Sequence, residues 1–296
     1  MVIKKTKSNK RKEKRNKTKK IRKPQCAPNP NSTLDFTCYS NEALFKLREL
    51  WNARHPDVLI TSNDPKEIWI KLNNYMSGSC NNEMCWIKQS FIKSNLNKEI
   101  LNYTFAPEAP DSWKSNPQEW LSSLDILNIM KQYEKRYKCF DFLGPSPIDF
   151  DSHLLYGECV WEELCHFNLK DYIKNKKNKL GIIFNLDPHY KSGSHWVALF
   201  INIKKRKIYY FDSYGEKPDD QILKFINKVI EQGKELNIKF NYKYNEKRHQ
   251  YSNSECGMYS LYFIIENLKD SSIKKLFNES IKDDEMIHLR KVYFNG

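Results

Sequence analysis

Three short segments carry side chains that could act together on a peptide bond. The first contains His195 and Trp196, the second ends at Asp212, and the third runs from Gln250 to Cys256. A cysteine thiolate is a strong nucleophile, an imidazole can serve as its base, and a carboxylate can hold that imidazole in one tautomer. A glutamine amide can donate to the oxyanion of acyl transfer. Together these residue types predict cysteine-protease chemistry, with Cys256 as nucleophile.

Two apolar runs of strand length would bring His195 to Asp212. Residues 196–203 and 207–212 are apolar or aromatic almost throughout, and a basic turn at 204–206 separates them. In an antiparallel pair, the start of one strand lies beside the end of the other. We therefore expect the two side chains to meet at one end of the sheet. Taken alone, each is ambiguous, because Asp212 could be a turn residue and His195 a polar residue near a sheet edge.

Cys256 precedes an apolar segment, 257–268, that predicts a buried helix. The positive end of a helix and a neighbouring imidazolium both stabilise a thiolate. The amide of Gln250 and the backbone N–H of Cys256 would then be the two oxyanion donors. Gly257 places no side chain beside the sulfur, so we expect a substrate carbonyl to approach there.

The order of elements predicts an α+β fold. Helical patterns dominate to about residue 137, with helix starts at Asp64-Pro65 and at Asn116-Pro117. Strand-like runs follow at 180–186, 196–203, 207–212 and 238–244, with helices at 219–236 and 257–268. Runs that are apolar on both faces predict central strands covered on each side. We expect a mixed sheet flanked by helices, with a basic disordered tail and linker at 1–33, a helical N-terminal region at 34–115 and a protease core at 116–296.

The net charge of +14 is concentrated at one end of the chain. Residues 1–23 contain thirteen Lys or Arg and a single Glu. A segment of this kind predicts disorder and non-specific contact with nucleic acid, or alternatively a nuclear address or a solvated arm. The remaining chain is almost balanced in charge.

The eight cysteines are expected to be thiols. No apolar run reaches the ~18–20 residues of a membrane span, and no secretory signal opens the chain, so we expect no membrane association and a reducing compartment. Cys80 and Cys85 are closely spaced, but no second pair or Cys/His knuckle follows in the sequence. We therefore predict neither a metal site nor a cofactor.

The spaced motifs resemble one known family. Gly-x-His-Trp-Val at 193–197, Phe-Asp-Ser at 211–213 and Gln-x5-Cys-Gly at 250–257 are similar to the C48 cysteine proteases, which include the SUMO and ubiquitin-like-protein proteases, with the adenovirus protease as a distant relative. The resemblance implies a papain-like, adenovirus-protease-like core. It also implies that His195 is the base, Asp212 its orienter, Gln250 an oxyanion donor and Cys256 the nucleophile. Trp196 would cover a narrow channel for the Gly-Gly of a protein substrate, and Trp120-Leu121 is loosely similar to a further family segment.

A closer resemblance covers 195–198 and 248–261. These segments are similar to the polyprotein-processing proteases of African swine fever virus and of mimivirus-like giant viruses. The resemblance implies a cysteine endopeptidase of a large DNA virus, which cleaves structural polyproteins after Gly-Gly during virion maturation, in the virion or the viral factory of the host cytoplasm.

Two alternatives remain open. The same active site could remove host ubiquitin-like modifiers, which also end in Gly-Gly. From another class, the chain could be a non-enzymatic virion scaffold that binds nucleic acid through residues 1–23. A Cys256→Ala variant separates the scaffold from the proteases, because only a protease would lose its activity.

Overall fold

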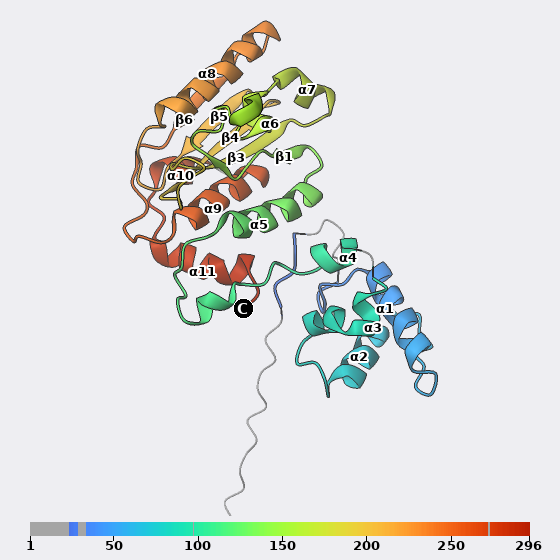
Figure 1. Ribbon diagram of the computed structural model, residues 1–296. Helices are drawn as coiled ribbons and strands as arrows, with labels where there is room; N and C mark the ends of the chain where they lie inside the picture. The colour runs from blue at the N-terminus through green and yellow to red at the C-terminus, as the bar shows by residue number, and fades with distance from the viewer. Residues whose placement is uncertain (1–23, 29–33, 97, 272) are drawn as a thin grey trace, which may run out of the picture.

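The chain folds into a helical region, residues 34–103, and a sheet region, residues 121–294 (Figure 1). The computed structural model describes residues 24–28, 34–96, 98–271 and 273–296. The predicted basic tail at 1–23 and linker residues 29–33 lie outside the described residues. In Figure 1 the helical region lies to one side of the sheet region, and a single connection, 104–120, leads from one to the other.

The helical region is built from short helices around one apolar cluster. Its elements are α1 Asn41–Arg54, α2 Pro65–Met76, η1 Glu83–Lys88, α3 Ser90–Lys93 and α4 Lys98–Tyr103. The predicted start of α2 is confirmed, since Asp64 accepts a hydrogen bond from the Glu67 N–H at 2.9 Å and Pro65 is the first helical residue. Leu44, Leu47, Ile68 and Leu72 are fully buried and join α1 to α2.

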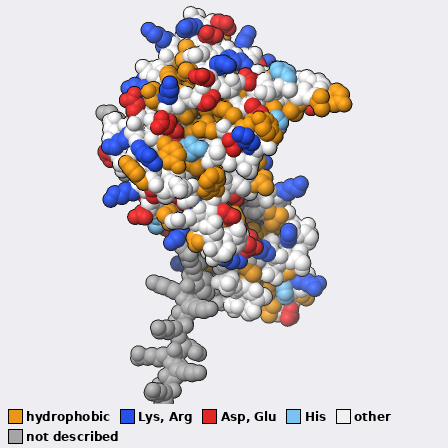
Figure 2. Space-filling view, turned by 60° about the vertical axis from the view of Figure 1, so that its left-hand side comes forward, with side chains coloured by type: hydrophobic (Ala, Val, Ile, Leu, Met, Phe, Trp, Pro, Cys, Tyr) orange, Lys and Arg blue, Asp and Glu red, His pale blue; other side chains and the backbone are white. Residues whose placement is uncertain are grey.

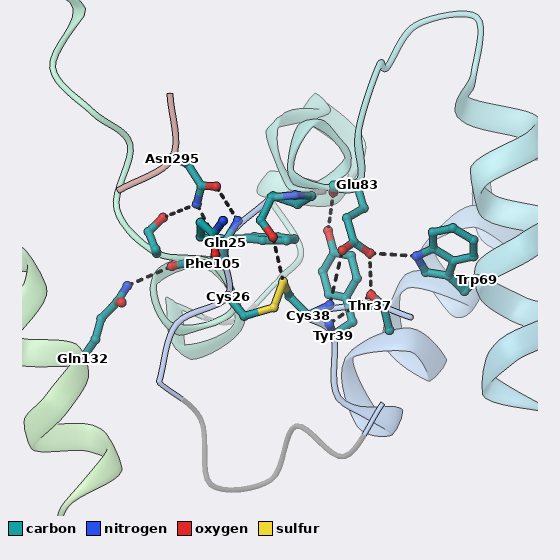
Figure 3. The surroundings of a disulfide bond; sticks show 12 residues. Gln25, Cys26, Thr37, Cys38, Tyr39, Trp69, Glu83, Phe105, Gln132 and Asn295 are labelled. Atoms are coloured by element: carbon teal, nitrogen blue, oxygen red, sulfur yellow. Dashed lines mark hydrogen bonds between the residues drawn. A yellow bond between two sulfur atoms is a disulfide. The ribbon is translucent and has the colours of Figure 1, made fainter. Parts of the chain in front are cut away.

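A buried carboxylate connects three parts of this region. Glu83 accepts hydrogen bonds from the Thr37 hydroxyl, from the Cys38 N–H at 3.3 Å and from the Trp69 indole N–H at 2.7 Å (Figure 3). Its backbone carbonyl accepts from the Tyr39 hydroxyl at 2.7 Å. A carboxylate held away from water requires donors of this kind. Glu83 thereby joins the segment before α1 to α2 and η1.

Six of the eight cysteines form disulfides, so the expectation of free thiols was wrong for them. The pairs are Cys26–Cys38, Cys80–Cys85 and Cys159–Cys165, while Cys139 and Cys256 are free. Local turns bring the Cα atoms of the pairs to between 5.2 and 6.3 Å, the distance that a disulfide spans. The expectation rested on compartment alone, and compartment says nothing of the distance between two cysteines.

A small ribbon joins the two regions. Cys26 pairs antiparallel with Phe105, and Glu108 pairs parallel with Asn295. The Asn295 side chain accepts from the Gln25 N–H at 2.6 Å and donates to the Ala106 carbonyl at 2.8 Å (Figure 3). Segments 25–27, 104–108 and 294–295 are therefore held together, although they are far apart in the sequence.

The sheet region contains one mixed sheet, in the order β1-β3-β4-β5-β6, with β2 also paired to β3. The strands are β1 Phe140–Phe142, β2 Ser146–Pro147, β3 Lys179–Asn185, β4 Trp196–Asn202, β5 Lys207–Phe211 and β6 Asn241–Tyr244. The pairs β3–β4 and β4–β5 are antiparallel, whereas β1–β3, β2–β3 and β5–β6 are parallel. The predicted hairpin of β4 and β5 is present, with Ala198 opposite Phe211.

Helices cover both faces of this sheet (Figure 1). On one face, Ile183, Ala198 and Phe200 pack against α5 Ser123–Arg136 and α9 Cys256–Leu268. On the other face, Ile182 and Leu199 pack in a cluster that includes α8 Asp220–Glu235 and α7 Leu169–Lys174. The remaining elements are η2 Asp111–Lys114, η3 Leu155–Gly157, α6 Glu162–Cys165, α10 Ile273–Asn278 and α11 Asp283–Tyr293. The predicted α+β class, a mixed sheet flanked by helices with a helical N-terminal region, is confirmed.

One predicted helix start was wrong. The signal at Asn116-Pro117 does not begin a helix; α5 begins at Ser123, where Ser122 and Asp125 form a reciprocal capping box. The predicted division at 115/116 stays a prediction, and Trp113 lies before it yet packs edge-on against Phe294 of the sheet region. No described helix combines the length and apolar character needed to cross a membrane.

Replacement of Glu83 tests its role in the helical region. Glu83→Ala leaves the buried Thr37 hydroxyl and Cys38 N–H without an acceptor, and we expect the free energy of unfolding to fall by about 3 kcal/mol. The matched control is Glu49→Ala, which removes an exposed acid that pairs with Lys46 on the surface of α1 and should cost less than about 1 kcal/mol. Urea denaturation monitored by tryptophan fluorescence measures both. Equal losses in the two variants would contradict this role.

Candidate active site

His195 and Asp212 meet at one end of the β4–β5 hairpin, as predicted. His195 directly precedes β4, Asp212 directly follows β5, and their Nε2 and Oδ1 atoms are 2.6 Å apart. The Asp212 side chain is almost fully buried, and the same oxygen accepts from the Tyr214 N–H at 2.9 Å. The carboxylate is thus fixed by its own turn while it holds the imidazole.

The environment of His195 favours the imidazolium. Burial alone would lower its pKa, but hydrogen bonds and charge interactions with Asp212 and Cys256 outweigh that effect and raise the pKa to about 9. Because Nε2 is bonded to Asp212, the Nδ1 atom is the ring nitrogen that remains to serve Cys256. His195 is therefore protonated at neutral pH and lies between a carboxylate and a cysteine.

Cys256 is the first residue of α9 and is buried. Glu255 precedes it and forms a fully buried ion pair with Arg290 of α11, with Oε2 2.8 Å from Nε. Asp283, in the first turn of α11, accepts from the N–H groups of Tyr251 and Ser252 at 3.0 and 2.8 Å. The segment that leads to Cys256 is therefore held by α11.

Gln250 is buried, and its side chain is fixed at both ends. Its Oε1 accepts from the Ser213 hydroxyl at 2.7 Å, and its Nε2 donates to the Ser252 carbonyl at 2.7 Å. A primary amide has two N–H donors, so the second N–H is available for an oxyanion. The oxyanion role of Gln250 stays a prediction that this geometry permits.

Trp196 and Gly257 both contact Leu121, which lies between η2 and α5. The buried Trp196 indole donates to the Leu121 carbonyl at 3.0 Å, and a Cβ on Gly257 would lie 3.0 Å from the Leu121 Cβ. The open space expected beside Gly257 is thus not found there, because Leu121 occupies it. Glycine at 257 allows this close packing, and the predicted substrate contact of both residues stays a prediction.

Several residues that support the site were missed in the sequence. Asn245 clamps the Asp212 backbone, accepting from its N–H at 2.9 Å and donating to its carbonyl at 2.7 Å. The ring of Tyr214 stacks on His195 with centroids 4.6 Å apart, and the Arg248 guanidinium lies 4.9 Å from the Tyr214 ring. Asn245 and Tyr214 come from loops without periodic pattern, so no local signal marked them, and Arg248 lies at the start of the segment 248–261 but was given no role.

Trp120 is a further residue of this neighbourhood. Its indole donates to the Asn253 carbonyl at 2.7 Å, three residues before Cys256, and its side chain is 47% exposed. An aromatic side chain left open to solvent beside a nucleophile is a candidate for substrate contact. The loose motif similarity at Trp120-Leu121 was the one sequence signal that pointed here.

Comparison with known proteins agrees with this geometry. Residues 165–295 match the Ulp1 protease family, C-terminal catalytic domain. The chain is also 30% identical over 291 residues to R355 of Acanthamoeba polyphaga mimivirus, which is named as a thiol protease, with 92% of this chain and 93% of that protein covered. This chain belongs to the C48 protease family. It is a C48 cysteine peptidase.

Two further similar proteins come from African swine fever virus. A SUMO-1 cysteine protease of the Kenyan pig isolate is 26% identical over 256 residues, covering 80% of this chain and 91% of that protein. A crystal structure of the protease from this virus superposes with a TM-score of 0.65 at 21% identity, covering 92% of this C48 peptidase and 95% of that chain. The shared fold extends over the helical region as well as the sheet region.

Substitution of Asp212 tests the origin of the raised His195 pKa. Asp212→Asn removes the charge that stabilises the imidazolium, so we expect the His195 pKa to fall from about 9 and kcat/KM to fall by about 10²–10⁴-fold. The raised His195 pKa stabilises the fold at pH values below about 6.5, the ordinary pKa of the imidazole, and this stabilisation is lost as the pH rises through about 9. The stability deficit of Asp212→Asn should therefore shrink as the solution becomes alkaline. NMR titration of the His195 ring protons, with Cys256 retained in both proteins because it also raises this pKa, measures the change.

Asp220→Asn, at the exposed start of α8, is the matched control and should change neither quantity. An unchanged His195 pKa in Asp212→Asn would contradict the assignment of Asp212 as its stabilising partner.

The buried ion pair behind Cys256 gives a second test. Arg290→Ala leaves Glu255 buried without its cation and should lower the free energy of unfolding by about 3–5 kcal/mol, whereas Lys291→Ala on the exposed side of α11 should have little effect. The double variant Glu255→Gln, Arg290→Met should recover much of the loss, because no unpaired charge remains. Chemical denaturation measures all of these. A double variant no more stable than Arg290→Ala would show that the penalty does not come from the unpaired carboxylate.

Proposed function

We propose that this C48 peptidase is an endopeptidase of a large DNA virus that cleaves structural polyproteins after Gly-Gly during virion maturation. The observation that carries the chemistry is the contact of His195 with Asp212 on one side and Cys256 on the other. The viral origin of the relatives supports the biological setting. The virion and the viral factory are the proposed places of action.

The proposed mechanism follows from the positions of these groups. The Cys256 thiolate attacks the scissile carbonyl, and the oxyanion accepts from the Cys256 N–H and the second N–H of Gln250. As the first residue of a helix, Cys256 has a backbone N–H directed outward from the helix end. The His195 imidazolium gives its proton to the leaving amine. It then acts as base for the water that hydrolyses the thioester and releases the acid product.

Specificity for Gly-Gly is proposed from the aromatic surroundings of Cys256. The Trp120 indole donates a hydrogen bond to the Asn253 carbonyl, in the loop before Cys256, and the Trp196 indole donates one to the Leu121 carbonyl. Two tryptophans on the path of the substrate to Cys256 would narrow that path, so that only residues without side chains would fit there. A substrate with larger residues in the last two positions before the scissile bond would be excluded by size.

A second substrate class has a specific observation in its favour. The swine fever relative is named a SUMO-1 cysteine protease, and ubiquitin-like modifiers also end in Gly-Gly. Recognition of such a modifier needs a folded partner, whereas a polyprotein site needs only an extended segment. The two substrates can therefore be separated by the length and folding of the protein offered.

Cleavage assays decide between these substrates. We expect wild type to cut Gly-Gly-x peptides derived from structural polyproteins, Cys256→Ala to lose at least about 10⁴-fold in rate, and a Gly-Gly to Ala-Ala change in the peptide to abolish cleavage. Alkylation followed by mass spectrometry should label Cys256 faster than the other free thiol, Cys139. Efficient processing of a SUMO fusion without cleavage of the peptides would favour the modifier instead.

A further inference from the structure

Two groups of side chains that can bind metal share Cys159 beside a hairpin at residues 152–160: His153 and Cys165 belong to one group, and Glu162 and His166 to the other. His153 and Cys159 face each other across it as an isolated antiparallel bridge, supported by the bond from the Val160 N–H to the Ser152 carbonyl at 2.9 Å. Directly opposed residues of an antiparallel pair project to the same face. Cys165 and His166 lie at the end of the short helix α6, which follows the hairpin.

The distances in this cluster are close to those of a zinc site. The Cys159 Sγ is 3.9 Å from the Nε2 of His153 and 3.7 Å from the Nε2 of His166. It is bonded to Cys165, and the ligand atoms of His153, Cys159 and Cys165 all lie within 4.8 Å of one another. In a tetrahedral zinc site with bonds of about 2.0–2.3 Å, the ligand atoms are about 3.3–3.8 Å apart. The two S–N distances are thus close to the edges of such a tetrahedron.

We propose that the reduced form of this cluster binds one Zn²⁺ through His153, Cys159, Cys165 and His166. Two thiolates and two imidazoles are a common donor set for structural zinc. Glu162 is adjacent, but its Oε1 already accepts from the Cys159 N–H at 2.9 Å, and its Oε2 lies 3.2 Å from His166. Glu162 therefore supports Cys159, and its Oε2 must release the His166 Nε2 when that nitrogen binds the metal. The sequence predicted no metal here because the hairpin that opposes His153 to Cys159 was not foreseen.

The disulfide and the zinc site are two states of the same sulfurs. Two equivalents of a small-molecule thiol, such as glutathione, reduce the Cys159–Cys165 bond and are themselves joined as one disulfide. The two cysteine thiols then each release a proton as they bind Zn²⁺. The His153 and His166 side chains are exposed, so the metal can enter from solvent.

Both the disulfide and the proposed zinc site hold the hairpin, whose tip is exposed and apolar, to α6. Leu155 and Tyr156 at the end of the hairpin are 85% and 101% exposed, and hydrophobic side chains project from the edge of the sheet region in Figure 2. Asp149, in the segment before the hairpin, lies with its carboxylate 2.7 Å from the Nδ1 of His189, in the segment that leads to His195. The cluster thus holds a projecting element that follows a segment connected to the loop before His195.

Metal binding to the purified full chain tests the proposal. Cys256→Ala is the starting protein, because the catalytic thiol and imidazole could themselves hold zinc. After reduction and gel filtration with Zn²⁺, we expect one equivalent of zinc by mass spectrometry, and tetrahedral d–d bands with sulfur charge-transfer absorption when Co²⁺ replaces it. Cys159→Ser with Cys165→Ser should abolish binding, and His153→Ala or His166→Ala should each weaken it at least 10-fold.

Cys80→Ser with Cys85→Ser is the matched control, since it removes a disulfide that belongs to no metal-binding cluster of the described residues. This control variant should still bind one equivalent of Zn²⁺. Reduced protein without zinc, equal zinc in the Cys159/Cys165 variant, or unchanged affinity in both histidine variants would overturn the proposal. The Co²⁺ spectrum of the unsubstituted cluster keeps the test valid if a variant fails to fold.

Discussion

The ion pair between Glu255 and Arg290 is the interaction on which the active site depends. Both side chains are buried, so each charge needs the other to remain in the interior. Glu255 is bonded in the chain to Cys256, and Arg290 also lies over the Trp113 ring at 4.5 Å. The position of Cys256, the predicted nucleophile, is therefore set by Arg290, thirty-four residues further along the chain. Phe294 and Asn295, which follow that helix, continue the connection to the helical region.

The other half of the site depends on a close approach of two backbone segments. The N–H groups of His249 and Gln250 both donate to the Ser213 carbonyl, at 2.8 and 2.9 Å. Gly215 has φ +79°, and a Cβ there would lie 2.8 Å from the backbone of Lys247. The turn after β5 and the loop before α9 are thereby joined along their length. This places Gln250, the predicted oxyanion donor, beside Asp212, the carboxylate that contacts His195.

Much of this arrangement could be predicted from the sequence, because it follows from periodic elements. The β4–β5 hairpin alone brings His195 to Asp212, and the apolar run after Cys256 predicts α9. The capping box of α5 was missed because Asn116-Pro117 gave a stronger start signal than Ser122. Pairings between distant loops, such as Asn245 with Asp212 or Glu255 with Arg290, have no local pattern. The same holds for the disulfides, whose distances depend on turns that single residues do not specify.

The ribbon of segments 25–27, 104–108 and 294–295 has a consequence for the order of folding. Its contacts span up to 270 residues, from Gln25 to Asn295. Closure of so long a loop carries the largest entropic cost of any contact described, and non-local contacts of this kind form late. During synthesis the helical region leaves the ribosome well before Asn295, the residue that joins it to the sheet region. A ribosome-bound chain can therefore fold its helical region early, but that region is docked only after residue 295 has emerged.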